Sequence, residues 1–259
     1  MIRSRQNQIV KNIRGLRRRQ GDHLLLEGPR LLEEARRAGV ALELVLMSPS
    51  YAEKSLRPEG SRPSEGEPVL VEEALLASLC DADSPQGVLA LGRRPRPGAE
   101  GLPERRGAVY LYLDGVQEPG NLGAIARVAE AFGAVGMALA PGCAHPNHPR
   151  ALRASAGSLL RLPVAVAVTV ADLDARLGAL APVWIGLAAR GGGRPTAAEV
   201  TGSIVLVLGS EGAGISPAVA DRLDRSWTIP LAEPVESLNV AVAAGVVLSD
   251  LHRERAKHA

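Results

Sequence analysis

The sequence predicts an α/β protein whose larger, C-terminal part is built on a parallel sheet. Five near-continuous apolar runs occur after residue 107, separated by helical segments: 109–113, 135–140, 164–168, 183–187 and 204–208. Strands that are buried on both faces of a parallel sheet have this composition. Ligands of such sheets bind at the carboxyl ends of the strands, so we expect the functional residues there.

A smaller α/β domain is predicted ahead of this sheet, because short strand and helix patterns alternate. We expect strands at 23–28, 42–47, 69–71 and 88–91, and helices at 29–38 and 72–79. Residues 93–106 are rich in Pro, Gly and charged residues, which predicts an interdomain linker. A smaller break at 55–68 predicts an internal loop.

Length and composition exclude several classes of protein. The 259 residues, 46% of them hydrophobic and 22% charged, suffice for one or two domains with real cores. The apolar runs are far shorter than the ~20 residues that a membrane span needs. No apolar run follows the charged N-terminus, and two cysteines do not make a disulfide framework. We therefore expect a cytoplasmic protein with no membrane partner.

The N-terminus is strongly basic. Residues 1–20 hold seven arginine and lysine residues and no acidic residue. Such a cluster suits a polyphosphate partner, of which RNA is the first candidate, although a solvated helix face would look the same. Only 2% of the residues are aromatic, so RNA would be bound through shape and phosphate contacts. Arginine greatly outnumbers lysine, which suits phosphate binding, but codon bias in a GC-rich genome explains it better.

Three short segments at predicted strand ends hold polar side chains. The first, 121–127, opens a helix: Asn121 is placed to cap it, and Arg127 lies off its apolar stripe. The second, 208–214, places Glu211 among three glycines, which lets the backbone approach a flat ligand. A plain tight turn is the alternative for that segment.

The third segment, 229–239, leads into an apolar helix at 240–248, for which Ser237 is a candidate N-cap. A helix that is apolar on nearly every face must be buried in its own domain or in a partner. Helix N-termini also present free N–H groups to ligands.

Two other kinds of site have weaker support. Cys143, His145 and His148 offer three zinc ligands without a fourth of matching spacing, so we expect no metal. The glycines of 208–214 lack the Gly-x-Gly-x-x-Gly spacing of a dinucleotide site. A nicotinamide oxidoreductase is therefore a weak alternative.

Taken together and in this order, the three segments resemble the SpoU (TrmH-like) family of RNA ribose 2′-O-methyltransferases, within the SPOUT superfamily. The resemblance covers about residues 107–252 and rests on Asn-x5-Arg, Gly-x-Glu-Gly and Glu-Ser-Leu-Asn. Residues 1–92 are similar to the small, ribosomal-protein-like RNA-binding domain that precedes the catalytic domain in many members. The expected organisation is therefore a substrate-binding domain at 1–92, a linker at 93–106 and a catalytic domain at 107–259.

The resemblance implies a C-terminal trefoil knot, a homodimer, and S-adenosylmethionine bound by backbone in the knot loops. The cofactor-binding positions that it implies are Leu208, Gly209, Ile229, Pro230 and Leu238. The catalytic positions that it implies are Asn121, Arg127, Glu211, Ser237 and Asn239.

By the resemblance, Arg127 lies nearest to the reacting hydroxyl, and proposals for the family make it a general base. A guanidinium keeps its proton, which makes it a poor general base. Stabilising the developing alkoxide or fixing the adjacent phosphate does not require it to lose that proton. Asn121 would orient Arg127 or the ribose, and the other three would organise the site by hydrogen bonds. We expect ribosomal RNA in preference to transfer RNA because of the extra N-terminal domain. A tRNA 2′-O-methyltransferase and a non-catalytic RNA-binding protein stay open as alternatives.

Overall fold

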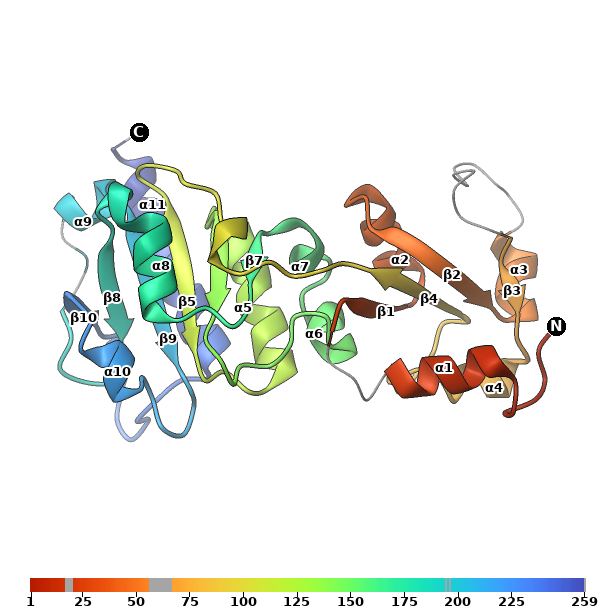
Figure 1. The fold of residues 1–259 in the computed structure, drawn as a ribbon. Coiled ribbons are helices and arrows are strands. Elements are labelled where there is room, and N and C mark those ends of the chain that lie inside the picture. Colours follow the sequence, from red (N-terminus) through yellow and green to blue (C-terminus); the bar gives the residue numbers. More distant parts are fainter. Residues whose placement is uncertain (17–20, 56–66, 194, 196, 259) are drawn as a thin grey trace. The chain divides into compact units, whose positions relative to one another are not determined.

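Two α/β units make up the chain in a computed structural model that describes residues 1–16, 21–55, 67–193, 195 and 197–258 (Figure 1). The first unit comprises Met1–Pro95 with Asn147–Arg161, and the second comprises Arg96–Pro146 with Leu162–Ala259. The predicted α/β class is confirmed. Most of the predicted loop 55–68 and the arginines at 17–19 lie outside the described residues. None of the helices in the described ranges has the length and apolarity to cross a bilayer.

The first unit contains a four-stranded sheet in the order β1-β4-β2-β3. Its strands are β1 (His23–Glu27), β2 (Ala41–Met47), β3 (Val69–Leu70) and β4 (Val88–Arg93). The central strand β4 is antiparallel to both β1 and β2, whereas β3 is parallel to β2. These strands lie where the alternating pattern predicted them.

Helices cover this sheet. Those of the first unit are α1 (Gln8–Leu16), α2 (Pro29–Arg37), α3 (Pro49–Ser55), α4 (Glu73–Ala77), α6 (Pro149–Ala154) and α7 (Ser158–Arg161). Apolar residues of α1 and α4 share one core cluster with side chains of β1, β2 and β4. Helices α2 and α6 contact β1.

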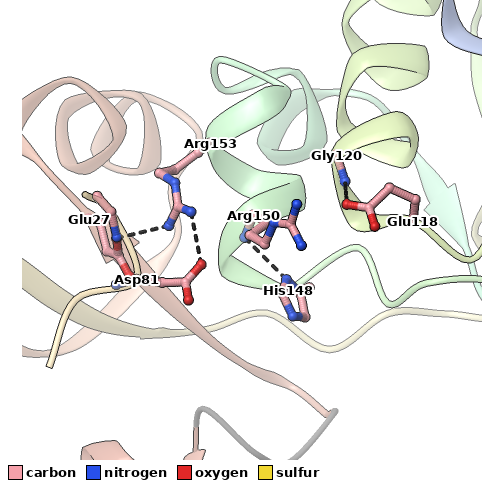
Figure 2. A network of polar contacts seen from close by, with 8 residues as sticks. Glu27, Asp81, Glu118, Gly120, His148, Arg150 and Arg153 are labelled. Carbon is pink, nitrogen blue, oxygen red and sulfur yellow. Dashed lines mark hydrogen bonds and ion pairs between the residues drawn. The ribbon is translucent and has the colours of Figure 1, made fainter. Parts of the chain in front are cut away.

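The segment Asn147–Arg161 belongs to the first unit although it lies between two strands of the second along the chain. Its main anchor is Arg153, which reaches two carboxylates (Figure 2). The nitrogen Nη1 lies 2.9 Å from Glu27 Oε2, and Nη2 lies 2.9 Å from Asp81 Oδ2. We call Arg153, Glu27 and Asp81 the Arg153 clamp. The predicted domain limits stay a prediction, and a contiguous sequence pattern could not reveal this grouping.

The second unit is built on a six-stranded sheet in the order β10-β8-β9-β5-β6-β7. Its strands are β5 (Val109–Asp114), β6 (Gly136–Leu139), β7 (Val164–Ala165), β8 (Val183–Leu187), β9 (Ile204–Gly209) and β10 (Arg225–Trp227). All pairings are parallel, and the central strands are buried on both faces. The predicted parallel sheet is confirmed, with β10 as an additional strand.

The helices of the second unit pack on this sheet. They are α5 (Pro119–Ala131), α8 (Val170–Leu177), α9 (Ala197–Thr201), α10 (Pro217–Ala220) and α11 (Val240–Ala256), with short 3₁₀ turns η1 (Ala99–Gly101) and η2 (Gly178–Leu180). Residues of α8, α10 and η1 pack with Tyr112 and Trp184 into one core cluster. Helices α5 and α11 contact each other, and α11 lies behind the sheet while α8 lies in front (Figure 1).

The chain ahead of β5 packs closely on the second unit. Ala99 and Leu102 are buried in its core cluster, and Arg176 Nε donates to the Leu102 carbonyl at 2.9 Å. The hydroxyl of Tyr110 donates to the Pro103 carbonyl at 2.7 Å. Most of the stretch 96–106 is therefore held by side-chain contacts, despite its linker-like composition.

Candidate active site

The strand order defines one place where a ligand is expected. From β5, the strands β6 and β7 extend the sheet in one direction, and β9, β8 and β10 extend it in the other. Ligands of open α/β sheets bind beyond the carboxyl ends of the strands at such a switch point. The last residues of β5 and β9, Asp114 and Gly209, are partners in register.

A tight turn follows β9 at this point. Ser210 and Gly214 exchange two backbone hydrogen bonds of 3.0 Å each, and Ala213 N donates to Ser210 Oγ at 3.1 Å. A Cβ on Gly209 would lie 2.3 Å from the carbonyl carbon of Gly214, so no larger residue fits there. The glycines of this segment thus form a tight turn, which leaves Glu211 exposed at its tip.

Asp114 fixes the far end of this turn. Its Oδ2 accepts a hydrogen bond from Ser216 N at 2.6 Å, just before α10 begins. Because Asp114 ends the neighbouring strand, the carboxylate joins β5 to the chain that leaves the turn. Sequence reasoning missed this residue, although its position at the end of a predicted strand was a usable signal.

A second loop, residues 188–193, runs beside β10. Ala188 N donates to the Trp227 carbonyl at 2.9 Å, and Gly192 N donates to Thr228 Oγ1 at 2.8 Å. A Cβ on Gly192 would lie 2.6 Å from the Trp227 carbonyl carbon, so the two backbones pass unusually close. No chemical signature marks this loop in the sequence, because its residues next to the cavity are small and apolar.

A cavity of about 530 Å³ opens between the two loops and the segment before α11. Of the five predicted cofactor-binding residues, Leu208, Gly209, Ile229 and Leu238 line it, and Pro230 does not. The predicted catalytic residues that line it are Glu211, Ser237 and Asn239. Further wall residues, which the sequence did not single out, are Leu187, Ala188, Ala189, Leu231 and Ala243.

Three polar side chains from distant parts of the sequence form a hydrogen-bonded chain at this cavity. Asn239 Nδ2 donates to Asn121 Oδ1 at 3.0 Å, and Asn121 Nδ2 donates to Glu211 Oε1. They come from the start of α11, the first turn of α5 and the turn after β9. The structure therefore brings together one residue from each of the three predicted segments.

Two predicted helix caps are wrong. Helix α5 begins at Pro119, and Glu118, not Asn121, caps it by accepting a hydrogen bond from Gly120 N at 3.3 Å (Figure 2). Proline fits this first position because it has no N–H to satisfy. Helix α11 is capped by Asn239, not Ser237: its Oδ1 accepts from Ala241 N at 2.9 Å and from Val242 N at 3.3 Å.

Arg127 lies apart from the cavity wall. It is exposed on α5, as its place off the apolar stripe predicted, and it has no hydrogen bond or ion pair within the part of the chain that the structure describes. Its guanidinium is thus available to a phosphate or an alkoxide. Ser237 is also exposed and lines the cavity.

Burial perturbs two other groups near the carboxyl end of β5. Desolvation raises the pKa of Tyr112 to about 12, and its hydroxyl donates to the Val168 carbonyl at 3.1 Å. Burial also raises the pKa of the Cys143 thiol, which donates to the Leu113 carbonyl at 3.1 Å. Both groups are therefore protonated at neutral pH. Across the described ranges, no three His, Cys, Asp or Glu residues gather as metal ligands.

The parallel sheet, the cavity at its switch point and the convergent polar side chains define a cofactor-binding α/β enzyme. A family model described as the SpoU rRNA Methylase family matches residues 108–249, and one described as an MRM3-like substrate binding domain matches residues 7–90. The chain belongs to the SpoU rRNA methylase family. The predicted family is confirmed, and the protein is an RNA methyltransferase.

Relatives along the whole chain agree with this membership. The chain is 33% identical to an uncharacterized tRNA/rRNA methyltransferase of Synechocystis sp., over 98% of this chain and 94% of the relative. It is 31% identical to the 23S rRNA (guanosine(2553)-2′-O)-methyltransferase RlmP of Bacillus subtilis, over 96% of this chain and 98% of the relative. The crystal structure of an AdoMet-bound rRNA methyltransferase from Sinorhizobium meliloti superposes with a TM-score of 0.81, 28% identity and 97% coverage of each chain.

Proposed function

We propose that the protein transfers the methyl group of S-adenosylmethionine to a ribose 2′-hydroxyl of 23S ribosomal RNA. The observation that carries this proposal is the chain Asn239–Asn121–Glu211 at a cavity beyond β5 and β9. The names of the relatives support it, since one is a 23S rRNA 2′-O-methyltransferase and another was crystallised with AdoMet.

The cavity fits the cofactor. Its volume of about 530 Å³ lies within the ~300–1,000 Å³ of small-ligand sites. The side chains of Leu208, Ile229 and Leu238 offer apolar surface to a flat base, and the glycine turn lets backbone groups approach. Pro230 follows Ile229 directly and remains a proposed contact. When bound, S-adenosylmethionine supplies an electrophilic methyl group.

The protein's own residues then position and activate the ribose hydroxyl. Alignment of reacting groups can contribute ~7–11 kcal/mol. Arg127 holds a permanent positive charge that stabilises the developing alkoxide or fixes the adjacent phosphate. Asn121 orients the ribose or Arg127, and Glu211 and Asn239 hold Asn121 from either side. Ser237 offers its hydroxyl at the cavity wall.

The first unit binds the RNA. The matched substrate-binding model spans residues 7–90 of this unit. Its N-terminal segment presents Arg3, Arg5 and Lys11 on the surface, and within the described chain none of them has an ion pair. Such cations suit the phosphate backbone, which supplies most of the sequence-independent affinity.

The remaining expectations complete the proposal. The enzyme works in the cytoplasm as a homodimer with a C-terminal trefoil knot. Exposed Val242 and Val246, one turn apart on α11, support a second copy on that helix.

Replacement of Arg127 by alanine tests the proposed chemistry. We expect Arg127→Ala to lower the turnover of 2′-O-methylation by ~10²-fold or more, as for loss of a charge-stabilising donor. Calorimetry should show unchanged affinity for S-adenosylmethionine, because Arg127 does not line the cavity. Arg106→Ala is the matched control, since Arg106 is another exposed arginine of the second unit.

Near-wild-type turnover in Arg127→Ala would refute the role of Arg127. A wild-type protein that gives no heat with S-adenosylmethionine would instead be a non-catalytic RNA binder. The substrate is tested by mapping 2′-O-methyl groups in RNA from cells with and without the gene. Loss of one such group from 23S rRNA is expected, whereas loss from a transfer RNA would assign the other substrate.

A further inference from the structure

The turn after β9 holds its shape by hydrogen bonds within itself. Ser210 and Gly214 pair through their backbones, and Ala213 N donates to Ser210 Oγ. These bonds fix the shape of the turn, but they do not fix its place relative to α5. The position of Glu211 at the tip is therefore set where the chain enters and leaves the turn.

Asp114 takes part in a link to the turn at each of these two points. At the entry, Asp114 is the register partner of Gly209, through the parallel pairing of β5 with β9. At the exit, its carboxylate accepts the hydrogen bond from Ser216 N at 2.6 Å. The first link uses the main chain alone, whereas the second needs an acceptor in the side chain. The side chain of Asp114 thus holds the end of the turn that strand pairing does not hold.

The chain that follows Asp114 leads to the partner of Glu211. A Cβ on Gly115 would lie 3.5 Å from the Cβ of Ser210, so the backbone after β5 runs in contact with the first residue of the turn. It then continues into α5, whose first turn carries Asn121. Asp114 therefore stands where the chain that carries Asn121 and the turn that carries Glu211 are joined.

The contact between Asn121 and Glu211 depends on this junction. It is an exposed hydrogen bond from Asn121 Nδ2 to Glu211 Oε1. Water competes for both partners of such a bond, so its net contribution is small. The bond is kept where the two backbones that carry the side chains are already in place. By contrast, the link from Ser216 N to Asp114 is half-buried and charge-assisted, which makes it the stronger of the two.

We infer that Asp114 is a positioning residue for methyl transfer: by holding the Ser216 amide at the end of β5, its carboxylate keeps the turn 210–214 where Glu211 reaches Asn121. This inference rests on the proposed function, in which Glu211 holds Asn121 at the site. Asp114 does not line the cavity, so it acts through the turn.

The first test compares kcat with cofactor binding, using total RNA from cells that lack the gene as the substrate. Asp114→Ala should lower kcat by about tenfold or more, because a misplacement of about 1 Å can cost ~10²-fold in rate. The Kd of S-adenosylmethionine should stay within about threefold, since strand pairing holds Leu208 and Gly209 without this side chain. Asp114→Asn should restore most of kcat, because its Oδ1 can accept the same N–H.

Asp224→Ala is the matched control. Asp224 Oδ2 also accepts a hydrogen bond from a strand amide, Trp184 N at 2.8 Å, but at the amino end of β8. We expect this variant to keep the wild-type kcat. Wild-type kcat in Asp114→Ala, or an equal loss of kcat in both alanine variants, would overturn the inference.

A double variant separates positioning from stability. Asp114→Ala leaves the half-buried amide of Ser216 without its acceptor, which is itself destabilising. Ser216 has a φ of −65°, the value that proline adopts, so Asp114→Ala with Ser216→Pro removes acceptor and donor together. We expect this variant to melt closer to the wild type than Asp114→Ala does and to keep the lowered kcat. Recovery of kcat together with the melting temperature would overturn the inference.

A double-mutant cycle asks whether Asp114 acts through Glu211. If it does, Glu211→Ala and Asp114→Ala remove the same contact, so the variant with both changes should be at most about twofold slower than Glu211→Ala. Losses of kcat that multiply would show that the two residues act independently, and would overturn the inference.

NMR gives a readout that does not depend on activity. The side-chain amide resonances of Asn121 report its bond to Glu211. Glu211→Ala and Asp114→Ala should shift them alike, whereas Asp114→Asn and Asp224→Ala should leave them in place. Unchanged resonances in Asp114→Ala would overturn the inference. If the wild type transfers no methyl group, or if Glu211→Ala keeps kcat, the proposed function fails at that point, and these resonances alone decide what Asp114 holds in place.

Discussion

Asn239 performs two tasks with the two ends of one amide. Its Oδ1 caps α11, and its Nδ2 donates to Asn121. Capping needs only an acceptor, whereas the link to Asn121 needs a donor. A substitution that keeps the acceptor and removes the donor therefore separates helix stability from organisation of the site.

Asn239→Asp makes this separation. Aspartate caps as well as asparagine, so we expect the free energy of unfolding to change by less than about 0.5 kcal/mol. Aspartate at residue 239 would then place a carboxylate on each side of the Asn121 amide. The Asn121 Oδ1 needs a donor, so it would face an acceptor, the carboxylate at residue 239 or that of Glu211, in either orientation of the amide. Loss of about 1.4 kcal/mol of alignment would lower kcat/KM about tenfold, which steady-state methylation assays would detect.

Asn239→Ala is the companion variant. It loses both tasks, so its unfolding free energy should fall by about 1 kcal/mol in thermal or denaturant melts, together with kcat/KM. Equal activity of Asn239→Asp and the wild type would show that the link to Asn121 is dispensable.

At the scale of residues, the sequence predicted the polar residues of the site better than the apolar residues that line the cavity. Asn121, Glu211 and Asn239 were predicted because they occupy the motif positions that the resemblance to the SpoU family implies. Their caps were misassigned because several adjacent residues could accept the same N–H bonds. Leu187 and Ala188 carry no chemical signature, and only the fold shows that they line the cavity.

Among the elements, α1 combines anchoring with charge. Val10 and Ile13 are buried in the core cluster of the first unit, while Lys11 on the same helix is exposed. Arg3 and Arg5 precede the helix and are also exposed. Substitution of the three cations therefore changes charge at the surface and leaves the packing intact.

We expect Arg3→Ala, Arg5→Ala and Lys11→Ala together to weaken RNA binding. For each phosphate that the protein no longer neutralises, the slope of log K against log salt should become shallower by about 0.7–0.9. Titrations of labelled RNA at several salt concentrations would measure it. Arg37→Ala is the control, because Arg37 already pairs with Glu33 at 3.2 Å; an unchanged slope in the triple variant would place the RNA elsewhere.

The sequence predicted the position of strands that have a long, continuous apolar pattern. The apolar runs predicted β5, β8 and β9 almost to the residue. The three-residue strand β10, Arg225–Trp227, was missed because a short stretch with a charged residue has no apolar period. Helix α11 continues to Ala256, beyond its apolar part, because its last turns hold charged pairs on the surface.

At the scale of the whole molecule, the exposed apolar side chains of α11 predict that two copies of the chain associate. Val242 and Val246 are 53% and 37% exposed, although the rest of the helix's apolar residues are mostly buried. Val242→Glu with Val246→Glu places charges on that face, and burying unpaired charge is costly. We expect sedimentation to give twice the chain mass of 27.1 kDa for the wild type and a single chain mass for the variant.

Leu70→Glu is the matched control for that experiment. Leu70 is also an exposed apolar residue, at 38%, but it lies in the first unit. A double variant of α11 that keeps the mass of the wild type would place the contact between copies on another face. A wild type that sediments as a single chain would refute the homodimer.

Because Asn147–Arg161 folds into the first unit, no single cut in the sequence separates the two units. An engineer who grafts residues 1–95 onto another catalytic domain would leave behind the helix that neutralises Glu27. The graft would then leave the Glu27 carboxylate without the charge of Arg153, and the amides of Asp81 and Ala82 would be its remaining hydrogen-bond donors among the contacts of the described residues. On the proposed function, transfer of the RNA-binding unit to another protein therefore requires two stretches of sequence, 1–95 and 147–161.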